Sequence, residues 1–239
     1  MLTYICMPIR KTKFTQGEIY HLCNRSNDKG LLFKDTNDWV RFLILMLYFQ
    51  SPTTIYNISR MVKTFSVRHP ASNTLDDINT NTESNIIKNR YVEILCFAIM
   101  PNHFHILIQE KQENGISKYV HKIQTAYAKY FNTKYKKTGH LFQGPFRAVH
   151  IKDNEQLLHT SAYIHRNPRE LKEWFNKEHT YLYSSYTDYT NKNRWGQLIN
   201  TSIILDQFNN LDTQTYKKFL EESGTKNSFE SENQQYLES

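Results

Sequence analysis

The clearest apolar pattern in the chain lies on both sides of a short turn at Pro101-Asn102. Apolar, branched and aromatic residues fill 91–100 before the turn and 103–109 after it, which predicts two adjacent antiparallel strands. Because strand side chains alternate between faces, His103 and His105 point to the same side. A strand rises about 3.4 Å per residue, so the two imidazoles start about 7 Å apart and can reach one metal ion. A histidine beside a turn and a partly buried core histidine would give the same pattern.

Apolar spacing along the rest of the chain predicts two more strands and three helices. The strands are expected at 18–24 and 148–151, and the helices at 36–50, 116–132 and 154–167. Aspartate N-caps precede the first and third of these helices. The order is strand, helix, strand, strand, helix, strand, helix. This βαββαβ order predicts an α+β fold, an antiparallel sheet with helices on one face, followed by a further C-terminal helix.

Two stretches are too polar to contribute to a core. Residues 68–90 are rich in Asn, Thr and Ser without apolar periodicity, which predicts a mobile insertion at about 66–90. Residues 223–239 are similarly polar and predict a disordered tail. The remaining chain, 1–222, is long enough to form a single domain around a substantial core.

Composition favours a cytoplasmic protein with a polyanionic partner. The formal net charge is +7, and the 16 Tyr and 14 Phe supply aromatic faces for packing and for base stacking. Three cysteines without paired spacing argue against a disulfide scaffold and for a reducing compartment. No apolar run approaches the roughly 20 residues that span a bilayer, and the N-terminus lacks the apolar region of a signal peptide. We therefore expect no membrane partner.

One stretch combines positive charge with aromatic residues. Between residues 118 and 152 there is no Asp or Glu. The cations are Lys118, Lys122, Lys129, Lys134, Lys136, Lys137, Arg147 and Lys152, and aromatic residues between them include Tyr119, Tyr130, Tyr135, Phe142 and Phe146. Cations bind phosphates by charge and counterion release, while aromatic rings stack on unpaired bases. The stretch predicts a surface for single-stranded nucleic acid, with a solvated helix face as the alternative.

The helix predicted at 154–167 carries a tyrosine and an amide on one face. Tyr163 and Asn167 are four residues apart, so they lie one helical turn from each other. Pro168 disfavours helical geometry at the residue before it and ends the helix there. Of three further histidines, His21 is interpreted as structural, and His159 and His165 either as structural or as supports for the metal ligands.

Four sequence blocks occur in an order that resembles a known family. Met-Pro-Asn-His-Phe-His-Ile-Leu-Ile at 100–108 is similar to the histidine–hydrophobic–histidine (HUH) motif of single-tyrosine transposases. Three more blocks look like those of the REP-associated tyrosine transposase branch: Gly-His-Leu-Phe-Gln-Gly at 139–144, Tyr-Ile-His-Arg-Asn-Pro at 163–168 and Tyr-Ser-Ser-Tyr at 183–186. The resemblance covers about residues 20–189. It implies a ferredoxin-like HUH endonuclease fold with the tyrosine on a C-terminal helix.

The resemblance implies a role for each matching residue. His103 and His105 match the catalytic metal ligands, and Tyr163 matches the nucleophile. Asn167 matches a third ligand, which is Gln in related insertion-sequence transposases. An amide carbonyl suits a hard cation, so Mg²⁺ or Mn²⁺ is the expected cofactor. The implied activity is cleavage and rejoining of single-stranded or hairpin DNA through a covalent 5′-phosphotyrosine, with Arg166 among the DNA-binding cations.

Functions of other classes stay open from the sequence. In a metal-dependent hydrolase, water would attack the phosphodiester and Tyr163 would only pack. A noncatalytic protein could bind DNA or RNA hairpins through the basic stretch alone. A replication initiator or relaxase would share the HUH motif, although the single-tyrosine helix and the short chain favour a transposase. The sequence is compatible with a monomer or a homodimer and does not specify the target DNA.

Overall fold

A four-stranded antiparallel sheet forms the centre of the computed structural model, which describes residues 12–68, 80–208 and 213–223. The strands are β1 (Ile19–Arg25), β2 (Val92–Met100), β3 (His103–Glu110) and β4 (Arg147–Ile151). They lie in the order β2-β3-β1-β4, and every neighbouring pair is antiparallel. The hairpin expected around Pro101-Asn102 is confirmed, because β2 and β3 pair directly across that turn.

Helices separate and follow these strands. They are α1 (Thr36–Tyr48), α2 (Ile58–Arg68), α3 (Thr80–Asn89), α4 (Gly115–Tyr135), α5 (Asn154–Arg166), α6 (Tyr186–Thr190), α7 (Ser202–Leu205) and α8 (Thr213–Glu222). Short 3₁₀ turns lie at Asn27–Lys29, Asn167–Glu170, Lys172–Trp174, Glu178–Thr180 and Gly196–Leu198. Both expected aspartate caps form. Asp35 accepts a hydrogen bond from the Asp38 N–H at 3.1 Å, and Asp153 accepts one from the Gln156 N–H at 2.7 Å.

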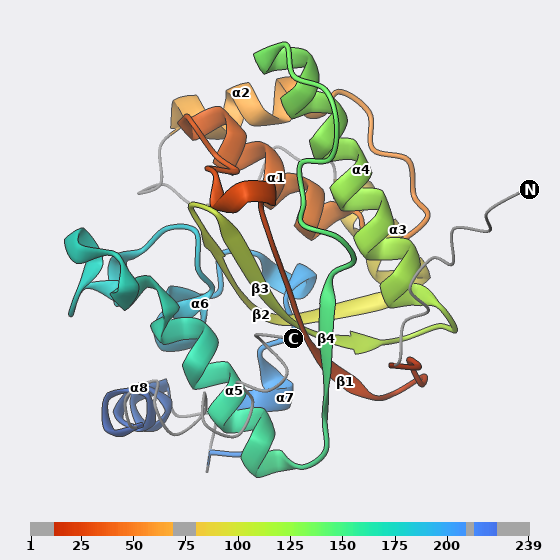
Figure 1. The fold of residues 1–239 in the computed structure, drawn as a ribbon. Helices are drawn as coiled ribbons and strands as arrows, with labels where there is room; N and C mark the ends of the chain where they lie inside the picture. The colour runs from red at the N-terminus through yellow and green to blue at the C-terminus, as the bar shows by residue number, and fades with distance from the viewer. Residues whose placement is uncertain (1–11, 69–79, 209–212, 224–239) are drawn as a thin grey trace, which may run out of the picture.

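One face of the sheet carries the main hydrophobic core, which α1 and α4 cover (Figure 1). Strand alternation sends Tyr20, Leu22 and Phe104 to this face, and none of them is more than 2% exposed. Helix α4 adds Tyr127, whose ring is buried and whose hydroxyl donates to the Leu32 carbonyl at 2.7 Å. Tyr127 is thus a core residue.

The opposite face carries a second apolar cluster beneath α5 and the C-terminal helices. Ala98, Leu107 and Ile151, from three different strands, pack in one cluster with Leu157 and Ile164 of α5. Figure 1 shows α5, α6, α7 and α8 together on the side of the sheet away from α1 and α4. The expected α+β order with an additional C-terminal helix is confirmed, and α5 forms a separate layer. Within the described ranges, no helix combines the length and apolar character needed to cross a bilayer.

Part of the expected polar insertion is folded, so the prediction of a mobile stretch at about 66–90 is wrong for α3. The Ile86 side chain of α3 is fully buried in the main core. The Tyr48 hydroxyl of α1 also donates to the Glu83 carboxylate of α3 at 3.2 Å. The local sequence does not predict this packing, because α3 has only ten residues and docks through one apolar side chain. The partners of that side chain lie elsewhere in the chain, so no local apolar pattern marks the helix. Two other stretches expected to be flexible lie outside the described residues: 69–79 and 224–239.

The replacement Ile86→Ala should lower the free energy of unfolding by about 2–5 kcal/mol, because it leaves a cavity between α3 and the core. Urea denaturation measures this change. Ile87→Ala is the matched control, since it makes the same change at a neighbouring, partly exposed position and should cost clearly less. Equally small effects at both positions would contradict the packing of α3 on the core.

Candidate active site

The strand histidines lie on the face of the sheet that α5 covers. His105 pairs with Cys23 of β1 and with Ala98 of β2, and His103 pairs with Arg25 and Met100 in the same way. Directly paired residues share a face of the sheet, and Ala98 belongs to the cluster beneath α5. The ring centroids of His103 and His105 are 5.0 Å apart. This is less than the spacing of alternate strand residues, so the two imidazoles lean toward each other.

The His103 imidazole has an oxygen atom at each ring nitrogen. Its Nδ1 lies 2.7 Å from Asn102 Oδ1, and its Nε2 lies 3.1 Å from Asn167 Oδ1. The Asn167 amide nitrogen donates to the Glu170 carboxylate at 3.4 Å, which turns the amide oxygen toward His103. A neutral imidazole has one N–H, so it cannot donate to both oxygens. The arrangement therefore suits either a doubly protonated ring or a cation between Nε2 and the amide oxygen.

His105 is in contact with a third histidine, His21 of β1. The His21 Nε2 and His105 Nδ1 atoms are 2.9 Å apart, and the two rings stack with centroids 5.1 Å apart. Burial lowers the pKa of His21 to about 4, because the charged imidazolium would lose its hydration. The sequence indicated a structural role for His21 and missed its place in this cluster. Its position on β1, two residues before the partner of His105, is visible only once the strand register is known.

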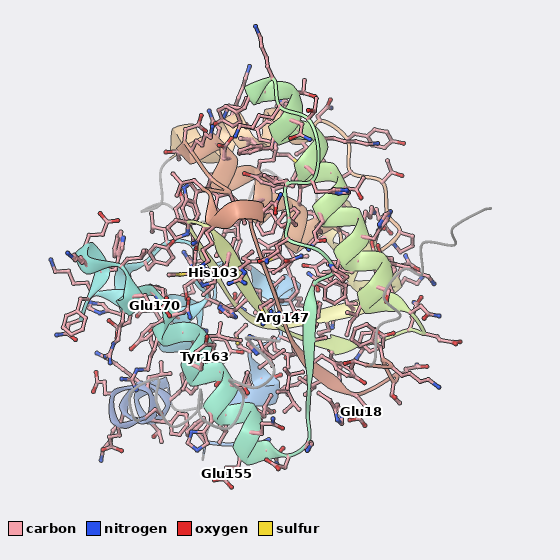
Figure 2. The ribbon with its side chains drawn as sticks, viewed as in Figure 1. Glu18, His103, Arg147, Glu155, Tyr163 and Glu170 are labelled. Carbon is pink, nitrogen blue, oxygen red and sulfur yellow. The ribbon has the colours of Figure 1, made fainter. Side chains whose placement is uncertain are left out.

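Tyr163 lies on α5 against the same histidines. Its ring centroid is 5.4 Å from that of His105 and 6.0 Å from that of His21, with both contacts edge to face. Figure 2 shows Tyr163 toward the C-terminal end of α5, with His103 above it and Glu155 at the N-terminal end of the helix. Asn167 follows one turn later, and its side chain is buried at 3% exposure. The helix thus brings both of its expected site residues to the strand histidines.

The two histidines of α5 contact groups away from this cluster. His165 is fully buried; its Nδ1 lies 2.8 Å from the Tyr216 hydroxyl, and its Nε2 lies 2.8 Å from the Ser185 hydroxyl. These contacts tie α5 to α8 and to the start of α6. His159 is exposed, with its Nε2 at 4.0 Å from the Glu155 carboxylate. Both positions fit the structural interpretation.

The expected basic surface is divided between the two sides of the sheet. Helix α4, which carries four of the expected cations, covers the face opposite the histidines. Lys122 donates to the Ser51 carbonyl at 3.1 Å, and its ammonium lies over the Phe49 ring. By contrast, Arg147 pairs with Cys23 on β1, which places it on the histidine face. Figure 2 shows Arg147 at the upper end of β4, beside the site. Five other expected cations are exposed: Lys118, Lys129, Lys136, Lys137 and Lys152.

Lys134 is not available to a nucleic acid, because its ammonium is paired with two carboxylates. One belongs to Asp35, the N-cap of α1, and the other to Asp38 within α1. The Lys134 ammonium lies 2.6 Å from the Asp35 carboxylate and 2.7 Å from the Asp38 carboxylate. Burial raises the pKa of Asp38, but the hydrogen bonds from Lys134 and Tyr135 outweigh it and leave that pKa below its ordinary value. The absence of acids between residues 118 and 152 is therefore a local property of the sequence. In the folded protein, acidic residues from the N-terminal end of α1 lie beside this stretch.

Three side chains of the cluster have the chemistry to hold a divalent cation: His103, His105 and Asn167. Neutral imidazole nitrogens and an amide carbonyl oxygen are ordinary ligands of such ions. Ligands at about 2.1 Å on neighbouring positions of an octahedral ion are about 3 Å apart, close to the 3.1 Å between His103 Nε2 and Asn167 Oδ1. Among the described residues, no group of three or more His, Cys, Asp or Glu side chains is arranged to hold a metal; the set found here includes an amide.

One family model matches the central part of the chain. Residues 52–167 match the family model described as "Transposase IS200 like", and this span contains His103, His105, Tyr163 and Asn167. Over that span the chain is similar to the IS200-like transposases. The resemblance expected from the motifs is confirmed at this level. His21 and β1 lie outside the matched span.

Among solved structures, the chain is similar to a REP-associated tyrosine transposase bound to a REP hairpin. The two proteins are 14% identical, with a TM-score of 0.49, over 76% of this chain and 84% of the other. No curated protein matches the chain.

Replacing Lys134 with methionine should lower the free energy of unfolding by about 1.5–3 kcal/mol at pH 7, because buried Asp38 loses a charged hydrogen-bond donor. Asp38 has a depressed pKa in the folded state, so its contribution is fully present above its unfolded pKa of 3.8 and is lost as the pH falls through the lower folded value. The penalty should therefore shrink in acid. Urea denaturation at several pH values measures it.

Lys137→Met is the matched control, because it removes an exposed cation from the end of the same helix. Its effect on stability should be small at every pH. A Lys134→Met penalty that is the same at pH 3 and pH 7 would contradict the ionic origin of the effect.

Proposed function

We propose that the protein is a metal-dependent single-stranded DNA endonuclease and strand transferase that uses Tyr163 as its nucleophile. One observation carries this proposal: α5 brings Tyr163 and Asn167, one turn apart, against His105 and His103 on the same face of the sheet. A nucleophile and a set of cation ligands are thereby held on rigid elements around one point. The IS200-like family match agrees with an enzyme acting on DNA.

In this mechanism His103, His105 and Asn167 hold a divalent cation, Mg²⁺ or Mn²⁺. When bound, the cation neutralises charge on the scissile phosphate and favours in-line displacement. The Tyr163 hydroxyl oxygen forms a bond to phosphorus as it loses its proton, and the bond from phosphorus to the 3′ oxygen breaks. The products are a 5′-phosphotyrosine and a free 3′-hydroxyl, which takes up a proton. Attack by a 3′-hydroxyl on the phosphotyrosine reverses the step, so strands are rejoined without ATP.

The substrate class follows from the residues around this point. A hydroxyl held on a helix can reach the backbone of an unpaired strand, and cations at the site neutralise the flanking phosphates. Arg147 on β4 and Arg166, beside Asn167, are the cations that we assign to the scissile region. Lys136 and Lys137 are exposed at the end of α4, on the other side of the sheet, and are not assigned to this region. We propose single-stranded DNA next to a hairpin as the substrate, in keeping with the motifs shared with the REP-associated branch.

Metal binding by the strand histidines is tested by thermal stability. Mn²⁺ at one hundred times its dissociation constant should stabilise the wild type by about 2.7 kcal/mol. His103→Ala removes a ligand and should abolish this gain. His105→Ala should abolish it too and should also lower stability without metal, because His105 is only 5% exposed.

The exposed residue His159 provides a control, and His159→Ala should respond to Mn²⁺ as the wild type does. If the His103→Ala variant is stabilised by Mn²⁺ as strongly as the wild type, the metal assignment is wrong.

The nucleophile is tested by trapping a covalent adduct. Incubation with labelled hairpin and single-stranded DNA and Mn²⁺ should give a protein–DNA band on a denaturing gel. Tyr163→Phe should remove this band while single-strand binding persists, because only the hydroxyl is lost. Tyr127→Phe and Tyr130→Phe are matched controls, since their hydroxyls donate to the Leu32 carbonyl and to Asp38 on the other side of the sheet.

Peptide mapping of the trapped adduct locates the linkage. A nucleotide on any residue other than Tyr163 contradicts the proposed mechanism. Cleavage without any adduct would instead favour a hydrolase in which water attacks.

A further inference from the structure

The contact between His21 and His105 gives β1 a part in the site. We infer that His21 is a positioning residue that fixes the ring and the proton of His105, so that His105 presents its Nε2 lone pair to a cation. The inference rests on the metal assignment proposed above. It concerns a residue outside the span that matches the family model, which begins at residue 52.

The proton on His105 decides which nitrogen can bind a cation. A neutral imidazole binds through the nitrogen that lacks hydrogen. His105 Nδ1 lies 2.9 Å from His21 Nε2, so one of these two atoms donates to the other. If His105 Nδ1–H is the donor, the lone pair of His105 lies on Nε2 and the His21 proton lies on Nδ1. The reverse arrangement would put a proton on His105 Nε2 and exclude it as a ligand.

His103 shows the same arrangement with a different partner. Its Nδ1 lies 2.7 Å from Asn102 Oδ1, an atom that can only accept, so the proton of a neutral ring lies on Nδ1 and the lone pair on Nε2. In the same way, His21 Nε2 would accept a hydrogen bond from His105 Nδ1, as Asn102 Oδ1 accepts one from His103 Nδ1. Metal-binding histidines commonly have their second ring nitrogen held in this way, which fixes both the tautomer and the orientation of the ring.

The surroundings of His21 hold it rigidly enough for this task. It is 4% exposed and lies on β1, which pairs with β3 on one side and β4 on the other. The His21 and His105 rings stack with 26° between their planes. The Tyr163 ring contacts both edge to face. His21 therefore supports the ligand and also forms part of the wall against which the tyrosine packs.

The test compares two replacements of His21 by Mn²⁺ titration of the full-length protein, followed by thermal shift or calorimetry. His21→Leu fills the space but cannot accept a hydrogen bond, and its Mn²⁺ affinity should fall by about 10- to 100-fold. His21→Gln places an amide oxygen at similar reach and should restore most of the affinity. Tyr189→Phe is the matched control, because it removes one buried hydrogen bond, to the Leu95 carbonyl, on the same side of the sheet; its affinity should match the wild type.

A spectroscopic measurement keeps the inference testable if His21→Leu does not fold. Long-range nitrogen–proton NMR spectra of the metal-free wild type, assigned with His21→Gln, report the tautomer of each ring. We expect protons on Nδ1 of both His21 and His105. A proton on His105 Nε2, or a His21→Leu variant that folds and binds Mn²⁺ as tightly as the wild type, overturns the inference alone. A wild type that binds no Mn²⁺ overturns the proposed function and the inference with it.

Discussion

The antiparallel pairing of β1 with β3 is the interaction on which the rest of the structure depends. Its register, with Cys23 opposite His105, decides which side chains face each layer of helices. A shift of one residue between them would turn either the histidines of β3 into the main core or Tyr20 and Leu22 of β1 toward α5. Both strands lie in the middle of the sheet and are paired on both edges. The candidate site is therefore built on the most restrained backbone of the molecule.

Helix α5 links this sheet to the rest of the candidate site. Its apolar residues pack on the sheet, while Tyr163 and Asn167 project toward the strand histidines. Behind them, His165 is held by Tyr216 and Ser185, and burial lowers its pKa to about 3, so that it stays neutral. These anchors follow the span that matches the family model. The C-terminal part of the chain thus restrains the helix that carries the proposed nucleophile.

Positive charge is distributed differently in space than along the sequence. The run from residue 118 to residue 152 has no acid of its own, yet Lys134 lies between Asp35 and Asp38 in the folded chain. Lys122 is occupied by a backbone carbonyl and an aromatic ring. Cations at the site come instead from strand and helix ends, as Arg147 does. A charge count within one segment therefore overestimates the surface that segment offers to a nucleic acid.

The sequence by itself determined every feature that depends on neighbours along the chain. Period-two alternation placed His103 and His105 on one face, and helical spacing placed Tyr163 one turn before Asn167. Aspartate caps marked where α1 and α5 begin. These features follow from backbone geometry, which repeats over a few residues and leaves its pattern in the local sequence.

Only the tertiary structure decided which distant residues meet. The contact of His21 with His105 joins residues 84 positions apart, and the pairing of Lys134 with Asp38 joins residues 96 positions apart. The burial of Ile86 likewise joins α3 to a core built by other elements. Each depends on strand register or helix docking. Strand register and helix docking are set by the packing of the whole core rather than by any one segment. For this reason the polar stretch that contains α3 can fold onto the core. For the same reason His21, whose local sequence indicates a structural role, can lie in the candidate site.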